Sequence, residues 1–268
     1  MASIRPAVAN MLKEAAAGWT TTPSVTEMNS ILRLMCKWRA HSLAETYFAR
    51  EGHIIYAGPF KGMTYVTAAS EGALIPRLLG TYECELHPYL EAFARDGLDC
   101  VIDVGCAEGY YAVGLARQMP GITVYAHDIE ERARTSCAEL AAKNGVAERV
   151  IIGGEFQPED FQRFAGRRAL VMVDTEGAEL DILQPDRGPA LAQMRIIVET
   201  HDVLRAGALA AMKSRFAATH DIVQVEMGAK VFEMPWWLKE LGHLDQLLAT
   251  WEWRSGPTPW LVMTPKGG

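Results

Sequence analysis

The fold is decided by the stretch Val101-Ile-Asp-Val-Gly-Cys-Ala-Glu-Gly-Tyr110. Its first residues have the apolar character of a buried strand, and Gly105, Ala107 and Gly109 then form a turn of small residues. An amphipathic helix is expected directly after the turn, over Tyr111–Met119. A strand that enters a helix through such a turn lets the backbone pass close to a bound nucleotide. The stretch therefore predicts a nucleotide-binding αβ unit.

The acidic residue of this stretch, Asp103, indicates which nucleotide fits. It places a negative charge at the carboxyl end of the strand, where the ligand lies. A phosphate-binding turn avoids such a charge, because a helix N-terminus attracts anions. S-adenosylmethionine carries a cation and no phosphate, so we predict that it is the cofactor of a methyltransferase. The residues of the turn predicted to bind it are Asp103, Gly105, Cys106, Ala107, Glu108, Gly109 and Tyr110.

Composition excludes several classes of function. The chain has 268 residues, of which 49% are hydrophobic and 22% charged, and its formal net charge is -7. These values are typical of a globular protein. The chain has no run of more than two basic residues, which argues against a nucleic-acid partner. No stretch approaches the roughly 20 apolar residues of a membrane span, and the charged first 13 residues do not resemble a signal peptide. Five cysteines without a Cys-x-x-Cys pair indicate a reducing compartment. We expect a cytoplasmic protein with no membrane partner.

Strand and helix patterns alternate along the rest of the chain, which predicts an α/β fold with a parallel, doubly wound sheet. The expected strands are Cys100–Val104, Thr123–His127, Val150–Gly153, Leu170–Asp174, Ile196–Thr200, Asp221–Met227 and Trp260–Met263. The expected helices are Pro88–Arg95, Tyr111–Met119, Glu131–Asn144, Pro158–Phe164, Glu179–Leu183, Ala190–Gln193 and Met212–Thr219. Such a sheet binds its ligand at the carboxyl ends of its strands.

The first part of the chain, residues 1–80, is predicted to be a helical extension followed by a hairpin, and residues 81–268 form the cofactor-binding domain. Ser24 or Thr26 is expected to cap the main helix of the extension. In the hairpin, His53–Ala57 and Met63–Val66 flank a turn that contains two glycines. The helices have three interpretations: a lid, a homodimer surface or core packing.

The second and third strands end in further candidates for the cofactor site. Asp128 follows the second strand at the spacing where a carboxylate meets ribose hydroxyls, and Ile129 would cover an adenine face. Gly154 and Glu155 follow the third strand and would meet the adenine edge. The alternative for Asp128 is that it caps the following helix. The alternative ligand is a nicotinamide dinucleotide, for which the turn lacks the preferred Gly-x-Gly-x-x-Gly pattern.

Two segments carry a resemblance to a known family. The stretch Val101–Tyr110 resembles motif I of the class I S-adenosylmethionine-dependent methyltransferases. Leu170–Leu183, in which Asp174 precedes Glu-Gly-Ala-Glu, resembles the fourth-strand signature of the FkbM family, and Arg195–His201 resembles that family's fifth strand. The resemblance implies a Rossmann-like seven-stranded sheet with its last strand reversed. It also implies O-methylation of small molecules such as natural products and sugars, and it places Tyr82 or Glu83 near the methionine ammonium, unless this segment is a helix start with Thr81 as its cap.

The catalytic candidates come from the ends of strands four and five. Asp174 ends the fourth strand, and Glu199 and His201 share one side of the fifth. In one interpretation His201 is the general base, oriented by a neighbouring carboxylate. In a second, Asp174, Glu199 and His201 bind a divalent metal ion (magnesium, manganese or zinc) that activates the acceptor. In the third, Glu199 and His201 form a structural pair and Asp174 caps the next helix.

Remaining candidates have weaker signals. Glu176 and Glu179 are expected to satisfy backbone amides at a helix start or, for Glu179, to face solvent. Trp236 and Trp237 are interpreted either as walls of an acceptor pocket or as packing. Two other function classes stay open at this point: a nicotinamide-dependent oxidoreductase, and a partner subunit that binds S-adenosylmethionine without catalysis.

Overall fold

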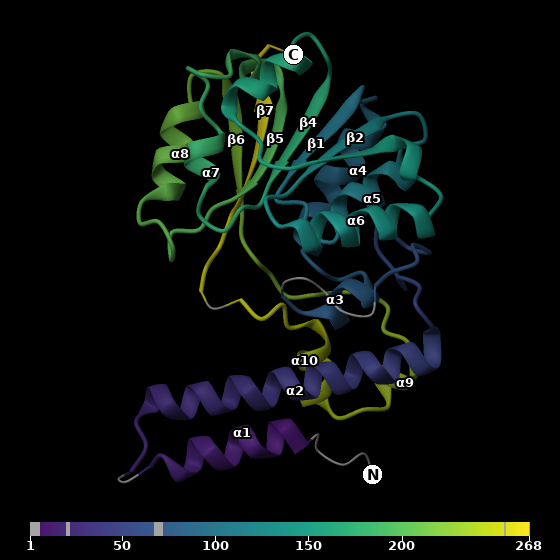
Figure 1. Cartoon of the computed structure of the whole chain (residues 1–268), viewed down its shortest axis with the longest axis vertical. Coiled ribbons are helices and arrows are strands. Elements are labelled where there is room, and N and C mark those ends of the chain that lie inside the picture. Colours follow the sequence, from purple (N-terminus) through teal and green to yellow (C-terminus); the bar gives the residue numbers. More distant parts are fainter. Residues whose placement is uncertain (1–5, 20–21, 67–71, 255, 268) are drawn as a thin grey trace.

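A seven-stranded sheet forms the centre of the computed structural model, which describes residues 6–19, 22–66, 72–254 and 256–267 (Figure 1). Parts of the predicted 1–80 unit thus lie outside the described residues. The strands run in the order β3-β2-β1-β4-β5-β7-β6, and β7 is antiparallel to both of its neighbours. The strands are β1 Cys100–Val104, β2 Thr123–His127, β3 Val150–Gly153, β4 Ala169–Val173, β5 Arg195–Glu199, β6 His220–Val225 and β7 Trp260–Pro265. The predicted Rossmann-like sheet with a reversed last strand is confirmed.

Helices cover both faces of the sheet (Figure 1). The first three strands have the predicted bounds; β1 is buried along its whole length, whereas β3 at the edge of the sheet exposes Ile151. The helices are α1 Pro6–Ala17, α2 Val25–Glu51, α3 Leu74–Leu79, α4 His87–Arg95, α5 Tyr110–Gln118, α6 Glu131–Lys143, α7 Glu179–Ile182, α8 Ala208–Phe216, α9 Trp236–Lys239 and α10 His243–Thr250. Short 3₁₀ helices occupy Cys84–Leu86, Ala147–Arg149, Pro158–Phe164 and Pro189–Gln193.

The alternation of side chains along the strands divides the core into two layers. In β1, Val101 packs with α4, α5 and α6, whereas Ile102 faces the opposite layer with α7 and α8. Asp103 follows Ile102 and therefore lies on the same face as Val101, where a contact with the backbone of Ala112 in α5 accompanies its burial. The sheet thus places a buried carboxylate under the start of α5.

A helical layer lies beyond the ends of the strands and joins the N-terminal extension to the C-terminal insert (Figure 1). Helix α2 contacts α3 and α10, and Arg39 of α2 makes two 2.7 Å contacts with Asp245 of α10. Ser24 caps α2 in a reciprocal capping box with Glu27, as predicted. The arms of the expected hairpin pair through one antiparallel bridge, Ile54 with Thr64, and through backbone hydrogen bonds from Ile55 to Met63 and from Tyr65 to His53.

The two halves of α2 differ in their burial. Its C-terminal half contributes Ala40, Leu43, Ala44 and Tyr47 to the core, whereas the N-terminal half exposes apolar side chains. The core-packing interpretation of the N-terminal helices therefore holds for the second half of α2, and a lid or homodimer surface stays a prediction for the first. Among the described residues, no helix has both the length and the apolar character that crossing a membrane requires.

Candidate functional site

The turn after β1 has a conformation that only its own small residues allow. Gly105 has φ +86°, and a Cβ atom there would lie 1.7 Å from the backbone oxygen of Asp174. Ala107 and Gly109 also have positive φ, at 48° and 93°. The amides of Gly105 and Cys106 both donate to the carbonyl of His127 at the end of β2. The turn is therefore fixed between β4 and β2, and Gly105 is required by close approach.

Asp128 connects this turn to β2. Its carboxylate accepts hydrogen bonds from the amides of Ala107, at 2.9 Å, and Glu130, at 2.8 Å. The N-cap of α6 is Glu130, without a side-chain cap. The interpretation of Asp128 as a helix cap is therefore wrong, and its carboxylate lies beside the turn.

A cleft of about 860 Å³ opens at the carboxyl ends of β1, β2, β3 and β4. This volume is in the range of small-molecule sites. The predicted cofactor residues that line it are Gly105, Ala107, Asp128, Ile129, Gly154 and Glu155. Its other carboxylates are Glu130, Asp174, Glu176 and Asp181, whereas its lining holds one arginine, Arg132. The cleft is therefore strongly acidic.

A second, small cavity of about 30 Å³ lies across the turn from the cleft and shares Gly105, Ala107 and Asp174 with it. Besides Gly105 and Ala107, five more predicted cofactor residues line this cavity: Tyr82, Asp103, Cys106, Glu108 and Tyr110. Arg77 also lines it, with its guanidinium 4.1 Å from the centre of the Tyr82 ring and 3.7 Å from Glu108. Arg77 was not among the predicted site residues, although a single charged residue in the apolar helix Leu74–Leu79 is a usable signal.

The buried carboxylate of Asp103 has an unusual proton affinity. Burial, together with the charges of Asp174 and Asp128, raises its pKa to about 7. Its Oδ2 has no hydrogen-bond partner in the described part of the chain. A buried carboxylate with one unpaired oxygen is suited to receive a cation.

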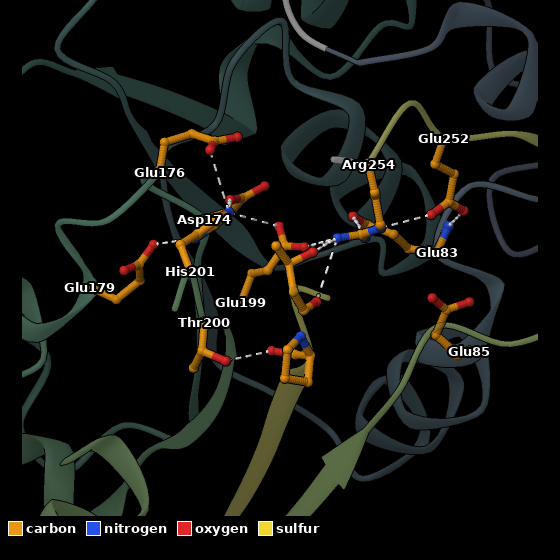
Figure 2. Close-up of polar contacts among 12 residues, drawn as sticks. Glu83, Glu85, Asp174, Glu176, Glu179, Glu199, Thr200, His201, Glu252 and Arg254 are labelled. Atoms are coloured by element: carbon orange, nitrogen blue, oxygen red, sulfur yellow. Dashed lines mark hydrogen bonds and ion pairs between the residues drawn. The ribbon is translucent and has the colours of Figure 1, made fainter. Parts of the chain in front are cut away.

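His201 is the centre of the second part of the site, at the ends of β4 and β5 (Figure 2). Its Nδ1 lies 2.6 Å from Oε1 of the buried Glu179. Its Nε2 lies 3.8 Å from Asp174, 3.5 Å from Glu176 and 3.5 Å from Glu199. Four carboxylates therefore surround one imidazole, three of them at a single nitrogen.

The charge balance of this cluster decides the state of the imidazole. Burial alone would lower the pKa of His201, but the hydrogen bond to Glu179 and the charges of Asp174 and Glu176 raise it. If Nδ1 donates to Glu179, Nε2 of a neutral ring carries a lone pair that faces three carboxylates, which is unfavourable. A proton or another cation at Nε2 removes this repulsion. The site is thus built to hold positive charge.

The predicted metal set changes in one member. Ligand atoms of Asp174, Glu176 and His201 lie within 4.8 Å of one another. Glu199 instead directs Oε1 to the guanidinium of Arg254. Two carboxylates and one imidazole, itself held by Glu179 from behind, are a donor set that suits a divalent cation. The residues present therefore fit a metal ion, with Glu176 in place of Glu199.

Several local predictions need correction here. Glu179 is buried rather than facing solvent, and it accepts from the amide of Gly177 as well as contacting His201. Asp174 does not cap α7, whose N-cap is Ala178 without a side-chain bond. Thr81 does not begin a helix but donates to the carbonyl of Pro76.

Glu83 belongs to a buried ion cluster rather than to the cavity lining (Figure 2). Its carboxylate accepts hydrogen bonds from Arg254, at 2.7 Å, and from the hydroxyl of Tyr111. The Nε of Arg254 lies 3.1 Å from Glu252, and Lys230 contacts both Glu252 and Glu85 at 2.6 Å. Burial and the charge of Glu83 raise the pKa of Glu252 to about 7. No local sequence pattern predicts this cluster, because its members come from distant segments.

The tryptophans of the insert mostly pack outside the cavities described above. Trp237 is buried and donates to Glu51 of α2, and Trp236 is exposed under the guanidinium of Arg50. The pocket-wall interpretation is therefore wrong for Trp237, which packs in the helical layer. Trp260 at the start of β7 lines the small cavity.

Known proteins resemble this chain in their three-dimensional structure. No protein-family model and no curated protein matches it. An O-methyltransferase from Bacillus cereus, solved with S-adenosylhomocysteine, is similar over 97% of both chains with 10% identity and a TM-score of 0.50. A putative O-methyltransferase from Klebsiella pneumoniae has 11% identity over 97% of this chain and 96% of its own, with a TM-score of 0.49. The O-methyltransferase TomG from Streptomyces achromogenes, solved with S-adenosylmethionine, has 13% identity over 68% and 81%, with a TM-score of 0.47. At such identities the likeness shows the fold alone, an α/β fold whose seven-stranded sheet has an antiparallel last strand.

Proposed function

We propose that this protein transfers a methyl group from S-adenosylmethionine to an oxygen of a small molecule. The observation that carries the proposal is the pairing of an acidic cleft at the β1 turn with a carboxylate-rich histidine site at the ends of β4 and β5. Asp174 belongs to both, because it lines the cleft and lies 3.8 Å from His201. A cofactor in the cleft would therefore present its methyl group next to His201.

The cofactor is expected to span the cleft and the small cavity. Its ribose would lie at Asp128, and its adenine between Ile129 and the segment that begins at Gly154. Its methionine end would enter the small cavity, where the unpaired oxygen of Asp103 meets the ammonium and Arg77 meets the carboxylate. The cavity of about 30 Å³ is smaller than the methionine end of the cofactor, so we expect its Tyr82 side to move outward on binding.

The acidity of the cleft disfavours the nicotinamide dinucleotides. A pyrophosphate carries two negative charges, which the six carboxylates of the cleft would repel. The cleft has one arginine to offset this repulsion. The sulfonium and the ammonium of S-adenosylmethionine gain from the same charges. We therefore place the oxidoreductase alternative second.

A divalent cation at Asp174, Glu176 and His201 is part of the proposal. When bound there, it would lower the pKa of an acceptor hydroxyl and hold the acceptor in place. Glu179 keeps the imidazole oriented through Nδ1, so that Nε2 faces the other two donors. Without a cation, His201 acts as the base only after Nε2 loses a proton among three carboxylates. The cation version is therefore favoured over the metal-free base.

The resemblance of Leu170–Leu183 to the FkbM signature supports this oxygen acceptor and makes sugars or natural products the proposed substrate class. The test is transfer of a labelled methyl group from S-adenosylmethionine into the small-molecule fraction of a cell extract, with Mn²⁺ or with a chelator. We expect labelled product only with Mn²⁺, and none with Asp128→Ala. The noncatalytic alternative predicts tight cofactor binding and no labelled product, and equal labelling after chelation would rule out the cation.

A further inference from the structure

Arg254 uses all three of its guanidinium nitrogens in the buried cluster beside His201 (Figure 2). Nη1 donates to Glu199 and Thr258, Nη2 donates to Glu83 at 2.7 Å, and Nε donates to Glu252 at 3.1 Å. The carboxylates are almost fully buried, and the Arg254 side chain is 12% exposed. The guanidinium is thus fixed in position as well as in charge.

The backbone around Arg254 is also held by hydrogen bonds. Arg33 of α2 donates to the carbonyl of Trp253, at 2.8 Å, and to that of Arg254, at 3.3 Å. Lys37 lies over the Trp253 ring and His41 meets its edge. The insert is therefore attached to the N-terminal helix at the point from which Arg254 reaches the sheet.

Backbone strain marks the same cluster. In the described ranges, four residues other than glycine have positive φ: Glu83, Ala107, Glu176 and Trp253. Ala107 is in the cofactor turn and Glu176 is beside His201. The other two, Glu83 and Trp253, contact or adjoin Arg254. Strained backbone concentrates at functional sites, where the surrounding structure maintains it. The ion cluster around Arg254 shares this property with the two parts of the site.

We propose that Arg254 is a positioning residue that withholds Glu199 from the cation at Asp174, Glu176 and His201. The guanidinium engages Oε1 of Glu199 and leaves Oε2 3.5 Å from Nε2 of His201. Glu199 therefore lies next to the donor set, but it is not one of the three residues whose ligand atoms lie within 4.8 Å of one another. The inference rests on the proposed cation site and adds the residue that sets its ligand number.

The consequence is a site that holds its cation less tightly than its carboxylates allow. As a fourth ligand and third carboxylate, Glu199 would strengthen binding of a divalent ion and would occupy a position that the acceptor oxygen needs. The positive charge of Arg254 also opposes the ion. Even in a water-like medium, an opposing unit charge several ångströms away weakens the binding of a divalent ion by roughly tenfold.

The test is titration of the full-length variants with Mn²⁺, with free Mn²⁺ counted by electron paramagnetic resonance. Arg254→Met is expected to bind Mn²⁺ about tenfold more tightly than the unmodified protein, because Glu199 is released and the charge is removed. Arg254→Met combined with Glu199→Gln should return to within about threefold of the original affinity, since the two charges cancel. The matched control is Arg39→Met, which removes another two-bond arginine–carboxylate pair, with Asp245, and should leave Mn²⁺ affinity unchanged.

A second comparison decides the matter if Arg254→Met does not fold. Glu176→Gln removes a ligand and should weaken Mn²⁺ binding by about 100-fold or more, whereas Glu199→Gln should weaken it by less than about tenfold. Equal losses in these two variants would overturn the proposal, and so would a folded Arg254→Met protein with unchanged or weaker affinity. Mn²⁺ binding by none of the proteins would contradict the cation site itself as well, which separates the two failures.

Discussion

Substitution of Gly105 by alanine tests whether the β1 turn is the cofactor-binding element. The new Cβ atom would lie 1.7 Å from the backbone oxygen and 2.7 Å from the backbone carbon of Asp174. Real Cβ atoms keep at least 3.0 Å from such atoms, and a backbone contact has no rotamer with which to escape. At φ +86°, alanine also pays about 1–2 kcal/mol of left-handed strain. With about 1–3 kcal/mol for the overpacking, the free energy of unfolding should fall by about 2–5 kcal/mol.

The assay is urea denaturation together with calorimetric titration of S-adenosylhomocysteine. The displaced turn carries Ala107, whose amide holds Asp128, so cofactor affinity should fall by about tenfold or more. Gly228→Ala is the matched control. Gly228 does not line the cleft and has no positive φ, and a Cβ atom there has no neighbour within 4 Å. A Gly105→Ala protein that is as stable as the control and binds the ligand equally well would refute the assignment of the turn.

Two further predictions use the buried titratable groups. Because burial raises the folded-state pKa of Asp103 from 3.8 to about 7, ionising it destabilises the folded state progressively as the pH rises from 4 to 7. Near pH 4, Asp103→Asn should therefore have the same unfolding free energy as the unmodified protein. At pH 8 its unfolding free energy should be higher by up to about 4 kcal/mol, as measured by urea denaturation without ligand. A difference that does not depend on pH would contradict this. Glu179→Gln removes the carboxylate that orients His201 and should weaken Mn²⁺ binding by about 10- to 100-fold, and an unchanged affinity would show that Glu179 does not act on the site.

The sheet was predictable because its signals are local. The strands β1, β2 and β3 are apolar runs with turn residues at their ends, and their bounds follow from the chain without reference to distant contacts. The hairpin at His53–Val66 was also predictable from local signals. Its two arms are joined by the bridge of Ile54 with Thr64 and by backbone hydrogen bonds such as that from Tyr65 to His53, although neither arm is a regular strand.

The cofactor turn and the acidic strand ends were also predictable, because topology alone places strand ends together. The partners of the catalytic candidates were not. Glu179 reaches His201 across 22 residues, and Arg254 reaches Glu83 across 171. Such contacts depend on how an insert folds onto the sheet, and no periodicity in the sequence encodes it. The exchange of Glu199 for Glu176 in the predicted metal set follows from this, because no sequence pattern indicates that Arg254 engages Glu199.

The central claim is that the acidic cleft is a site for S-adenosylmethionine, and calorimetric titration of S-adenosylhomocysteine against NAD⁺ tests it most directly. We predict micromolar binding of S-adenosylhomocysteine at one site per chain, lost in Asp128→Ala, and no heat of binding from NAD⁺. Binding of NAD⁺ in place of S-adenosylhomocysteine would contradict the account and restore the oxidoreductase interpretation.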